Sequence, residues 1–284
     1  MGAIARFSMQ GPRQAALMAV LFAALPLMYW VSAAIVALVV LRQGFNQGFN
    51  ILLAALLPGV AWYAVQQDIT IFVVVLGSAV MASVLRISAS LPKAISISVF
   101  VGLIAVWLLP ELSPQWYEVL EKGSQEYSVA LQDSMDPQMI QQLEPWLFPI
   151  LLGVVASMLQ LFTVGALLLG RHWQAKLFNP GGFKEEFHNL RLPYWYGLIA
   201  VVMFLISGSD PIFGSWMPIV LVPMFIMGIS VVHGVIAMGQ LSKQWLMGFY
   251  ISFLFFLPYM YALLILVALV DMLVDFRKRI SIKD

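Results

Sequence analysis

The stretch Asn179–Arg191, NPGGFKEEFHNLR, lies between two long apolar spans and divides the chain. It follows the segment GRHWQAKLF, which starts at Gly170, and the two segments hold two of the three histidines and charges of both signs. The run NPGG is a strong turn signal. Apolar residues follow at positions i, i+4 and i+7, a spacing typical of one helix face: Phe183, Phe187 and Leu190. The sequence therefore predicts a turn and then a short amphipathic helix.

The polar side of this predicted helix carries Lys184, Glu185, His188 and Arg191. Two interpretations are open. The simpler one is an interfacial helix that only connects two spans. The functional one is a docking surface for a cytoplasmic partner, with contacts from Phe183, Phe187, His188 and Arg191.

Composition places the whole chain in a membrane. Of its 284 residues, 62% are hydrophobic and 10% are charged, against about 25% charged in soluble domains. The mean hydropathy is +0.91, so we expect membrane lipids to surround the protein. The net charge of +1 indicates no nucleic-acid partner. The absence of cysteine excludes disulfides and thiolate metal sites, and no P-loop motif occurs, so ATP-driven work would need another subunit.

The apolar spans predict an all-α polytopic bundle of eight to ten membrane segments, forming one domain over residues 1–284. The two end runs, Ala15–Leu41 and Trp245–Phe276, are too long for one upright helix and carry central prolines, Pro26 and Pro258. Either one kinked helix or two short helices fit each run, and splitting both gives ten segments. Both prolines follow leucine and precede aromatic residues, which indicates either a structural repeat or chance similarity. The other predicted spans are Gly48–Val65, Ile69–Leu85, Ala94–Leu109, Trp146–Leu169, Tyr194–Ser207 and Trp216–Gly239.

Positive charge orients these segments. With both ends split, all of the 15 Lys and Arg residues except Lys122 fall on one side, which the positive-inside rule makes cytoplasmic. We therefore expect a bacterial inner-membrane protein with both termini and the 171–193 loop in the cytoplasm. Although Arg6 and Arg13 precede an apolar run as in a signal peptide, the run continues so far that we interpret it as an uncleaved helix.

An acidic stretch, 111–144, falls on the opposite, extracytoplasmic side. It holds seven carboxylates against Lys122. Asp136-Pro137 is typical of a helix N-cap followed by proline, and predicts a second short helix after a first one. The pair would be either a lid over an outward cavity or an amphipathic hairpin on the membrane surface. The apolar residues predicted to share one face of the first helix are Trp116, Leu120, Tyr127, Leu131 and Met135.

Polar groups inside apolar spans are candidate ligand contacts. His233 is one, although packing against another helix would also explain it. Asn46 and Asn50 are two more, at the polar start of a span. Gly44 and Gly48 beside them form G-x-x-x-G, so close helix packing is the alternative role of this region.

Asp271 and Asp275 lie on one face of the last helix, directly before Arg277, Lys278 and Arg279. We expect the carboxylates to pair with that basic cluster, and a cation site is the alternative. No hydrolase, metalloprotease or other catalytic motif occurs, so the sequence predicts no enzyme, metal or cofactor. An intramembrane enzyme would require Asp271 or His233 to meet another ionisable group within the bundle.

Four stretches carry a family resemblance: AALMAVLFAALP, GFNILLAALLPG after LRQG, NPGGFKEEFHNLRLP, and the ending LVDMLVDFRKR. They resemble the YybS-like family of bacterial predicted membrane proteins. These look like distant relatives of the S components of energy-coupling factor transporters.

The resemblance implies an S-component-like fold with an outward-facing cavity among the later helices, and membrane or ATPase partner subunits. S components contact their coupling subunit through small residues spaced A-x-x-x-A, and Ala15, Ala19 and Ala23 match that spacing. The function expected first is a transporter-like module that binds a small molecule and has no energy source of its own. The alternative is a structural or envelope-assembly scaffold that docks a cytoplasmic or membrane partner.

Overall fold

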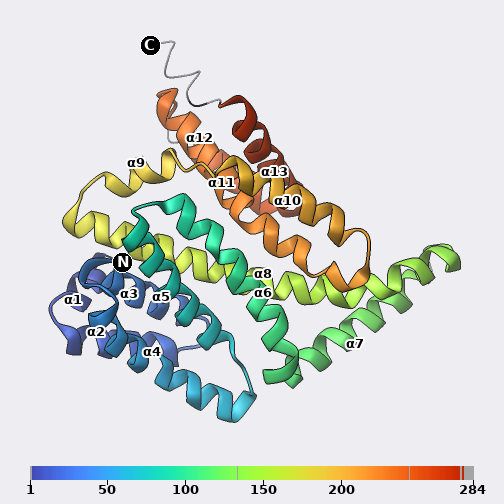
Figure 1. The fold of residues 1–284 in the computed structure, drawn as a ribbon, viewed down its shortest axis with the longest axis horizontal. Helices are drawn as coiled ribbons and strands as arrows, with labels where there is room; N and C mark the ends of the chain where they lie inside the picture. Colours follow the sequence, from blue (N-terminus) through green and yellow to red (C-terminus); the bar gives the residue numbers. More distant parts are fainter. Residues whose placement is uncertain (1, 133, 243, 276, 278–284) are drawn as a thin grey trace.

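A computed structural model describes residues 2–132, 134–242, 244–275 and 277. This part of the chain is built from helices and contains no strand, so the all-α prediction is confirmed (Figure 1). The elements are α1 (Gly2–Ser8), α2 (Pro12–Ala24), α3 (Tyr29–Gln43), α4 (Phe45–Gln66), α5 (Thr70–Ser88), α6 (Leu91–Leu112), α7 (Pro114–Leu131), α8 (Pro137–Phe178), α9 (Gly182–His188), α10 (Tyr194–Ser207), the 3-10 turn η1 (Pro211–Phe213), α11 (Trp216–Met238), α12 (Gln244–Phe255) and α13 (Leu257–Val274).

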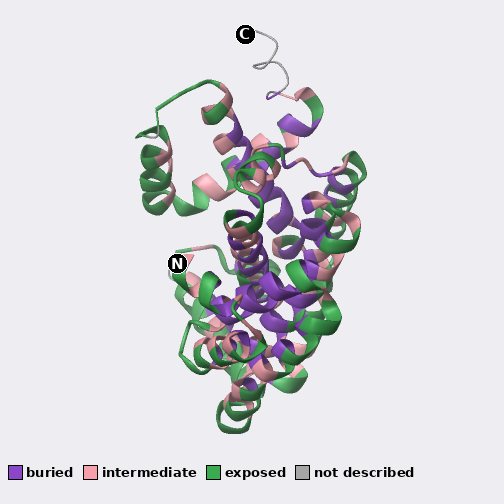
Figure 2. Ribbon diagram, turned by 90° about the vertical axis from the view of Figure 1, so that its left-hand side faces the viewer, coloured by how far each residue is buried: buried purple, intermediate pink, exposed green. Residues whose placement is uncertain are grey.

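Helix α3 is the centre of the first half of the fold. Every residue from Val31 to Leu41 is buried, and α2, α4, α5 and α8 surround the helix. Small residues allow this close packing. A methyl group on Gly170 of α8 would lie 2.8 Å from the carbonyl oxygen of Ala34, and one on Gly48 would collide with Val40. The Gly48 contact supports the helix-packing role of the G-x-x-x-G motif. Figure 2 shows the buried residues gathered along the middle of the molecule.

Both proline-containing end runs are split. The first breaks at 25–28, where Leu27 adopts a φ of 58°, and α2 then packs against α3 with a hydrogen bond from Ser32 Oγ to Ala19 O of 2.7 Å. The second breaks at Phe256, just before Pro258. At 12 and 13 residues, α12 and α2 are only about 18–20 Å long, less than the ~30 Å hydrocarbon core. Neither can cross that core as an upright helix.

The second half of the fold is arranged around α11. Helix α12 runs antiparallel to α11. Its Tyr250 contacts His233 near the end of α11, and its Phe253 contacts Phe225 earlier in α11. Helix α13 then returns alongside α11, beginning with Tyr261 against Phe225. The approach of α11 to α13 is so close that a methyl group on Gly228 would lie 2.2 Å from a backbone oxygen of α13.

Helices α7 and α8 form a hairpin that projects from the bundle (Figure 1). The predicted cap at Asp136 is confirmed, because its carboxylate accepts from Gln138 N at 2.8 Å. The predicted second short helix is wrong: α8 continues unbroken for 42 residues, through two prolines, into the bundle. Trp116 and Tyr127 of the predicted apolar face are exposed, so this face is not buried within the protein. The contact with α8 uses Tyr117, which packs on Phe148.

The two ends of the bundle differ in charge. We call the end that holds Arg42, Arg86 and the last turns of α8 the basic end. There Arg86 Nη1 donates to Leu41 O at 2.6 Å, and the Arg42 guanidinium lies 4.2 Å from the ring centroid of Phe178. The hairpin of α7 and α8 marks the opposite, acidic end. Lys243, Lys278, Arg279 and Lys283 of the charge count, and Asp133 of the acidic stretch, lie outside the described residues.

Six helices of the described chain are long and apolar enough to cross a membrane: α4, α5, α6, α8, α11 together with η1, and α13. Four shorter apolar helices, α2, α3, α10 and α12, bring the apolar segments to ten. Large apolar side chains are exposed on their outer faces, including Leu57, Val65 and Trp107. Such a surface suits lipid and is typical of a multi-pass membrane protein.

Candidate functional site

The 171–193 loop folds over the basic end of the bundle. The NPGG run forms the predicted turn, with Gly182 N donating to Asn179 O at 3.1 Å and Gly181 at a φ of 93°, a backbone angle that favours glycine. Helix α9 follows, as predicted, although it ends at His188 and so excludes Leu190 from its apolar face. Leu190 is nevertheless 1% exposed. It anchors the chain after α9 in the core.

Two contacts hold α9 against the bundle. The guanidinium of Arg171 on α8 binds the carboxylate of Glu186 through two nitrogens, one of them Nε at 2.9 Å. On the other side, Ser230 Oγ of α11 donates to Phe187 O at 2.5 Å. Arg171 is largely buried, so the ion pair is partly shielded from water. The loop is therefore fixed at both sides of α9.

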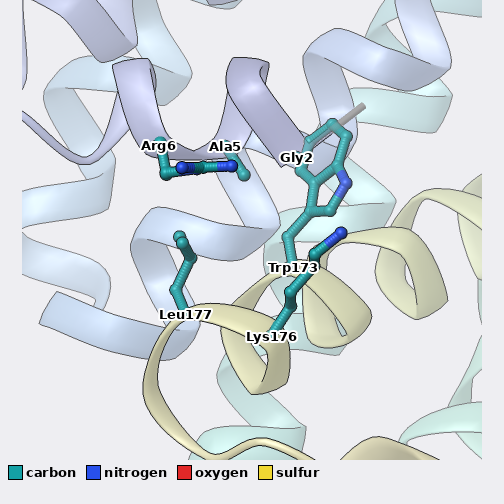
Figure 3. Close-up of a pocket in the computed structure, with 6 residues that line it drawn as sticks. All are labelled: Gly2, Ala5, Arg6, Trp173, Lys176 and Leu177. Atoms are coloured by element: carbon teal, nitrogen blue, oxygen red, sulfur yellow. The ribbon is translucent and has the colours of Figure 1, made fainter.

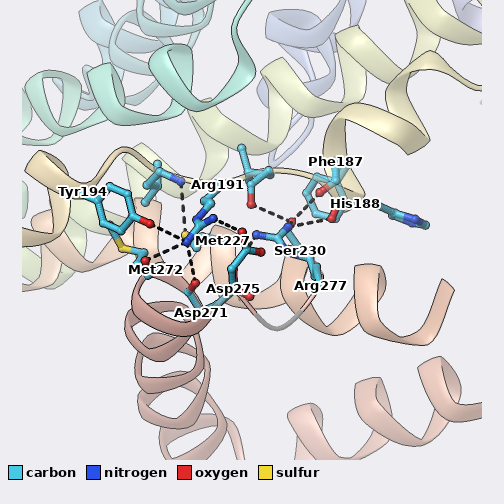
Figure 4. Close-up of polar contacts among 12 residues, drawn as sticks. Phe187, His188, Arg191, Tyr194, Met227, Ser230, Asp271, Met272, Asp275 and Arg277 are labelled. Atoms are coloured by element: carbon cyan, nitrogen blue, oxygen red, sulfur yellow. Dashed lines mark hydrogen bonds and ion pairs between the residues drawn. The ribbon is translucent and has the colours of Figure 1, made fainter. Parts of the chain in front are cut away.

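A buried ion pair ties the end of α13 to the same loop (Figure 4). Arg277 Nη2 donates to Asp271 Oδ2 at 2.7 Å, and the two side chains are 5% and 0% exposed. Arg277 Nη1 also donates to His188 O at 2.8 Å and lies 3.4 Å from Ser230 Oγ. The predicted pairing of Asp271 with the basic cluster is confirmed. A buried charge is tolerated when it is paired and hydrogen-bonded in this way.

Arg191 binds the other carboxylate of α13. Its Nη1 pairs with Asp275, and its Nη2 donates to Met272 O at 2.9 Å and to the Tyr194 hydroxyl at 3.0 Å. Asp275 thus pairs with the central loop, a partner that the sequence interpretation did not consider. Arg191, predicted to contact a partner protein, has its guanidinium engaged within its own chain.

Aromatic and histidine rings line the contact between α9 and α11. Phe183 stacks on Phe187 at 5.7 Å between ring centroids, and Phe187 meets His233 edge-on at 5.7 Å. His233 Nε2 lies 2.8 Å from the Tyr250 hydroxyl, and the ring centroids of His188 and His233 are 6.2 Å apart. Burial lowers the pKa of His188, and the charges of Lys184 and His233 lower it further.

The ionisable groups of this cluster are held in ion pairs, hydrogen bonds and ring contacts. Asp271 and His233 each meet an ionisable group, Arg277 and Tyr250, so the condition set for an intramembrane enzyme is met. Arginine cannot give up its proton in proteins, however, and Asp271 is bound to one. Within the described chain, no carboxylate hydrogen-bonds to the His233 ring to orient it, and no group of three metal-ligating side chains occurs.

Of the predicted ligand contacts, His233 is half-buried in this ring cluster, whereas Asn46 and Asn50 are exposed on α4. The assignment of Ala15, Ala19 and Ala23 to a partner contact is contradicted. These alanines are 0–1% exposed because α2 presents them to the core, where Ser32 of α3 donates to the backbone of Ala19. A partner cannot reach them in this packing.

Several residues of the cluster were not predicted. Glu186 and Tyr250 find their partners across a turn or on another helix, 15 and 17 residues away in the chain. No sequence periodicity links residues at such separations, so the pairs emerge only from the tertiary fold. Ser230 of α11 likewise donates to the loop backbone, 43 residues away in the chain.

Comparisons with known proteins add no identification: no family model matches the chain, and neither curated proteins nor solved structures yield a match.

Proposed function

We propose that this chain is a non-enzymatic membrane scaffold whose α9 surface docks a cytoplasmic partner. The observation that carries the proposal is the anchoring of α9. This seven-residue helix has no buried residue, yet Arg171, Ser230 and Arg277 bind it or its flanking backbone from three different helices or segments. A passive connection between two spans does not require a short exposed helix to be held so firmly.

Close packing around α11 supports a scaffold over the transporter-like module. A ligand cavity is expected among the later helices, but α11 packs there against its neighbours without room for an added methyl group. One on Gly102 of α6 would lie 2.5 Å from Ile219, and one on Gly153 of α8 would lie 2.3 Å from Ser215 O. Real Cβ atoms do not approach other atoms so closely. A small-molecule-binding transporter module without its own energy source is the less favoured proposal.

The docking surface carries both charge signs. Lys184, Glu185 and Asn189 are exposed on and beside α9, so a complementary protein surface would present polar groups of both signs. The positive-inside rule supports placing this surface in the cytoplasm of a bacterial cell, together with both termini, because the basic end carries most of the positive charge. The acidic hairpin would then face outward.

Photocrosslinking in intact cells tests the proposal. A photoreactive amino acid replaces Lys184 in one variant and Ile87, 86% exposed near the same end, in a control. We expect a single protein adduct at Lys184, identified by mass spectrometry, and none at Ile87. Adding Glu186→Gln, which removes the ion pair with Arg171, should reduce the yield.

Two results would oppose this function. Equal protein adducts at both positions would show non-specific proximity, and lipid adducts alone at Lys184 would show an interfacial helix without a protein partner. Orientation has a separate test, because the chain lacks cysteine. A single Lys184→Cys variant should react with a membrane-impermeant maleimide only after the cytoplasmic side is opened.

A further inference from the structure

A polar cavity lies between α1 and the last turns of α8, at the basic end. Its volume is about 250 Å³, and its lining residues are Gly2, Ala5, Arg6, Trp173, Lys176 and Leu177 (Figure 3). At about 30 Å³ for each water molecule in the liquid, the space corresponds to roughly eight waters. A phosphate group with part of its ester fits such a volume.

Trp173 lines this cavity and carries an unused donor that is covered in this packing. Its side chain is 1% exposed, and its indole Nε1 has no hydrogen-bond partner. Indole nitrogen can only donate, so the missing group is an acceptor. A buried N–H group without an acceptor destabilises the fold, and native proteins rarely contain one. The indole thus points to a molecule that supplies an acceptor.

Two cations stand beside this donor. Figure 3 shows the indole nitrogen of Trp173 on the side of the ring where the Lys176 ammonium lies. That ammonium also faces Gly2, where an added methyl group would be 3.3 Å from Nζ. Arg6 supplies a guanidinium at the other side of the space. Among the described residues, neither cation makes an ion pair or side-chain hydrogen bond. Three donors therefore surround one space that contains no carboxylate.

From this arrangement we propose that the cavity binds a phosphate-bearing anion. Arg6 and Lys176 neutralise its charge, and Trp173 Nε1–H donates to one of its oxygens after the exposed Lys176 side chain shifts to admit it. Arginine, lysine and neutral N–H donors form the usual contacts of phosphate groups in proteins. The phosphate belongs either to an anionic phospholipid of the adjacent leaflet or to a soluble phosphate ester, since basic pockets at membrane interfaces bind lipid headgroups.

Two binding measurements separate these sources. The full-length protein is purified in detergent, and native mass spectrometry counts retained phosphatidylglycerol against phosphatidylcholine. Thermal unfolding is followed with inorganic phosphate and with glycerol 3-phosphate, using chloride at equal ionic strength as the reference. Retention of phosphatidylglycerol alone identifies a lipid headgroup as the ligand. Stabilisation by the soluble phosphates identifies a soluble ester.

Matched variants show whether the cavity is responsible. Trp173→Phe keeps the ring and removes the donor, and Lys176→Gln removes one cation; we expect each to weaken binding about tenfold or more, as for hydrogen bonds to charged groups. The controls are Trp107→Phe, on a 73% exposed side chain, and Lys93→Gln, which removes one charge elsewhere; each should change binding less than about twofold.

The proposal is overturned if neither type of anion binds, because water would then satisfy the indole. It is also overturned if Lys93→Gln weakens binding as much as Lys176→Gln, because that result indicates diffuse attraction to the basic end. If Trp173→Phe fails to fold, Arg6→Gln and Lys176→Gln decide the outcome on their own.

Discussion

The buried pair of Asp271 and Arg277 provides the sharpest stability test. Replacing Asp271 with Asn keeps the shape of the side chain and removes its charge, which leaves the Arg277 guanidinium, 5% exposed, without its anionic partner. Loss of one member of a buried ion pair costs about 3–5 kcal/mol. We expect Asp271→Asn to lower the free energy of unfolding by that amount.

Asp275→Asn is the matched control, four residues away at the C-cap of the same helix. Asp275 and its partner Arg191 are 29% and 28% exposed, so solvent screens the pair and we expect a loss of about 1 kcal/mol or less. Unfolding by sodium dodecyl sulfate in mixed micelles, followed by circular dichroism, measures both. Similar losses for the two variants, or a loss below about 1 kcal/mol for Asp271→Asn, would refute the argument from burial.

A double variant, Asp271→Leu with Arg277→Met, adds an independent check. Replacing both charges with apolar side chains removes the cost of burying an unpaired ion, and such exchanges are often neutral or stabilising. We expect the double variant to be more stable than Asp271→Asn although it changes more atoms. A larger loss would show that the backbone contacts of Arg277 outweigh its charge pairing.

Three further outcomes follow from the packing and electrostatics. Gly228→Ala should lower the free energy of unfolding by about 1–3 kcal/mol, because the new methyl group meets the backbone of α13. Gly165→Ala, with open space around it, should be neutral or slightly stabilising. The same micelle titration measures both variants. The lowered pKa of His188 means that the unfolded chain binds more protons, so the unfolding free energy should fall as the pH drops below about 6.5, and His188→Asn should flatten that slope in titrations between about pH 5 and pH 8. Glu186→Gln should speed amide hydrogen exchange in α9 about tenfold, whereas Glu185→Gln, on an exposed side chain, should leave the exchange unchanged.

The loop at the basic end shows where sequence reasoning succeeded. The NPGG run specifies its turn locally, because glycine and proline restrict or extend the backbone angles of their own residues. The pattern at Phe183 and Phe187 specifies α9 in the same way. By contrast, Arg171 and Glu186 pair across that turn, and neither residue has a local signal that names its partner.

The alanines of α2 show why sequence reasoning also failed. Small residues spaced A-x-x-x-A favour close packing, but the spacing does not say whether the neighbour is a partner protein or another helix of the same chain. In this fold α2 packs against α3 and α4, and Ala15, Ala19 and Ala23 are buried within the protein.

By itself the sequence determined the class of the protein: an all-helical membrane bundle, its apolar segments, and a kink or break near Pro26 and Pro258, which the structure shows to be a break in both cases. These properties depend on hydropathy and on local backbone preferences, which act over a few neighbouring residues. Only the tertiary structure decided which residue of the basic cluster pairs with Asp271, and that Asp275 meets Arg191. It also decided that Trp173, whose indole nitrogen has no partner among the described residues, lines a cavity with Arg6 and Lys176. Those contacts depend on which helix faces come together, and apolar helices of similar composition do not specify this locally.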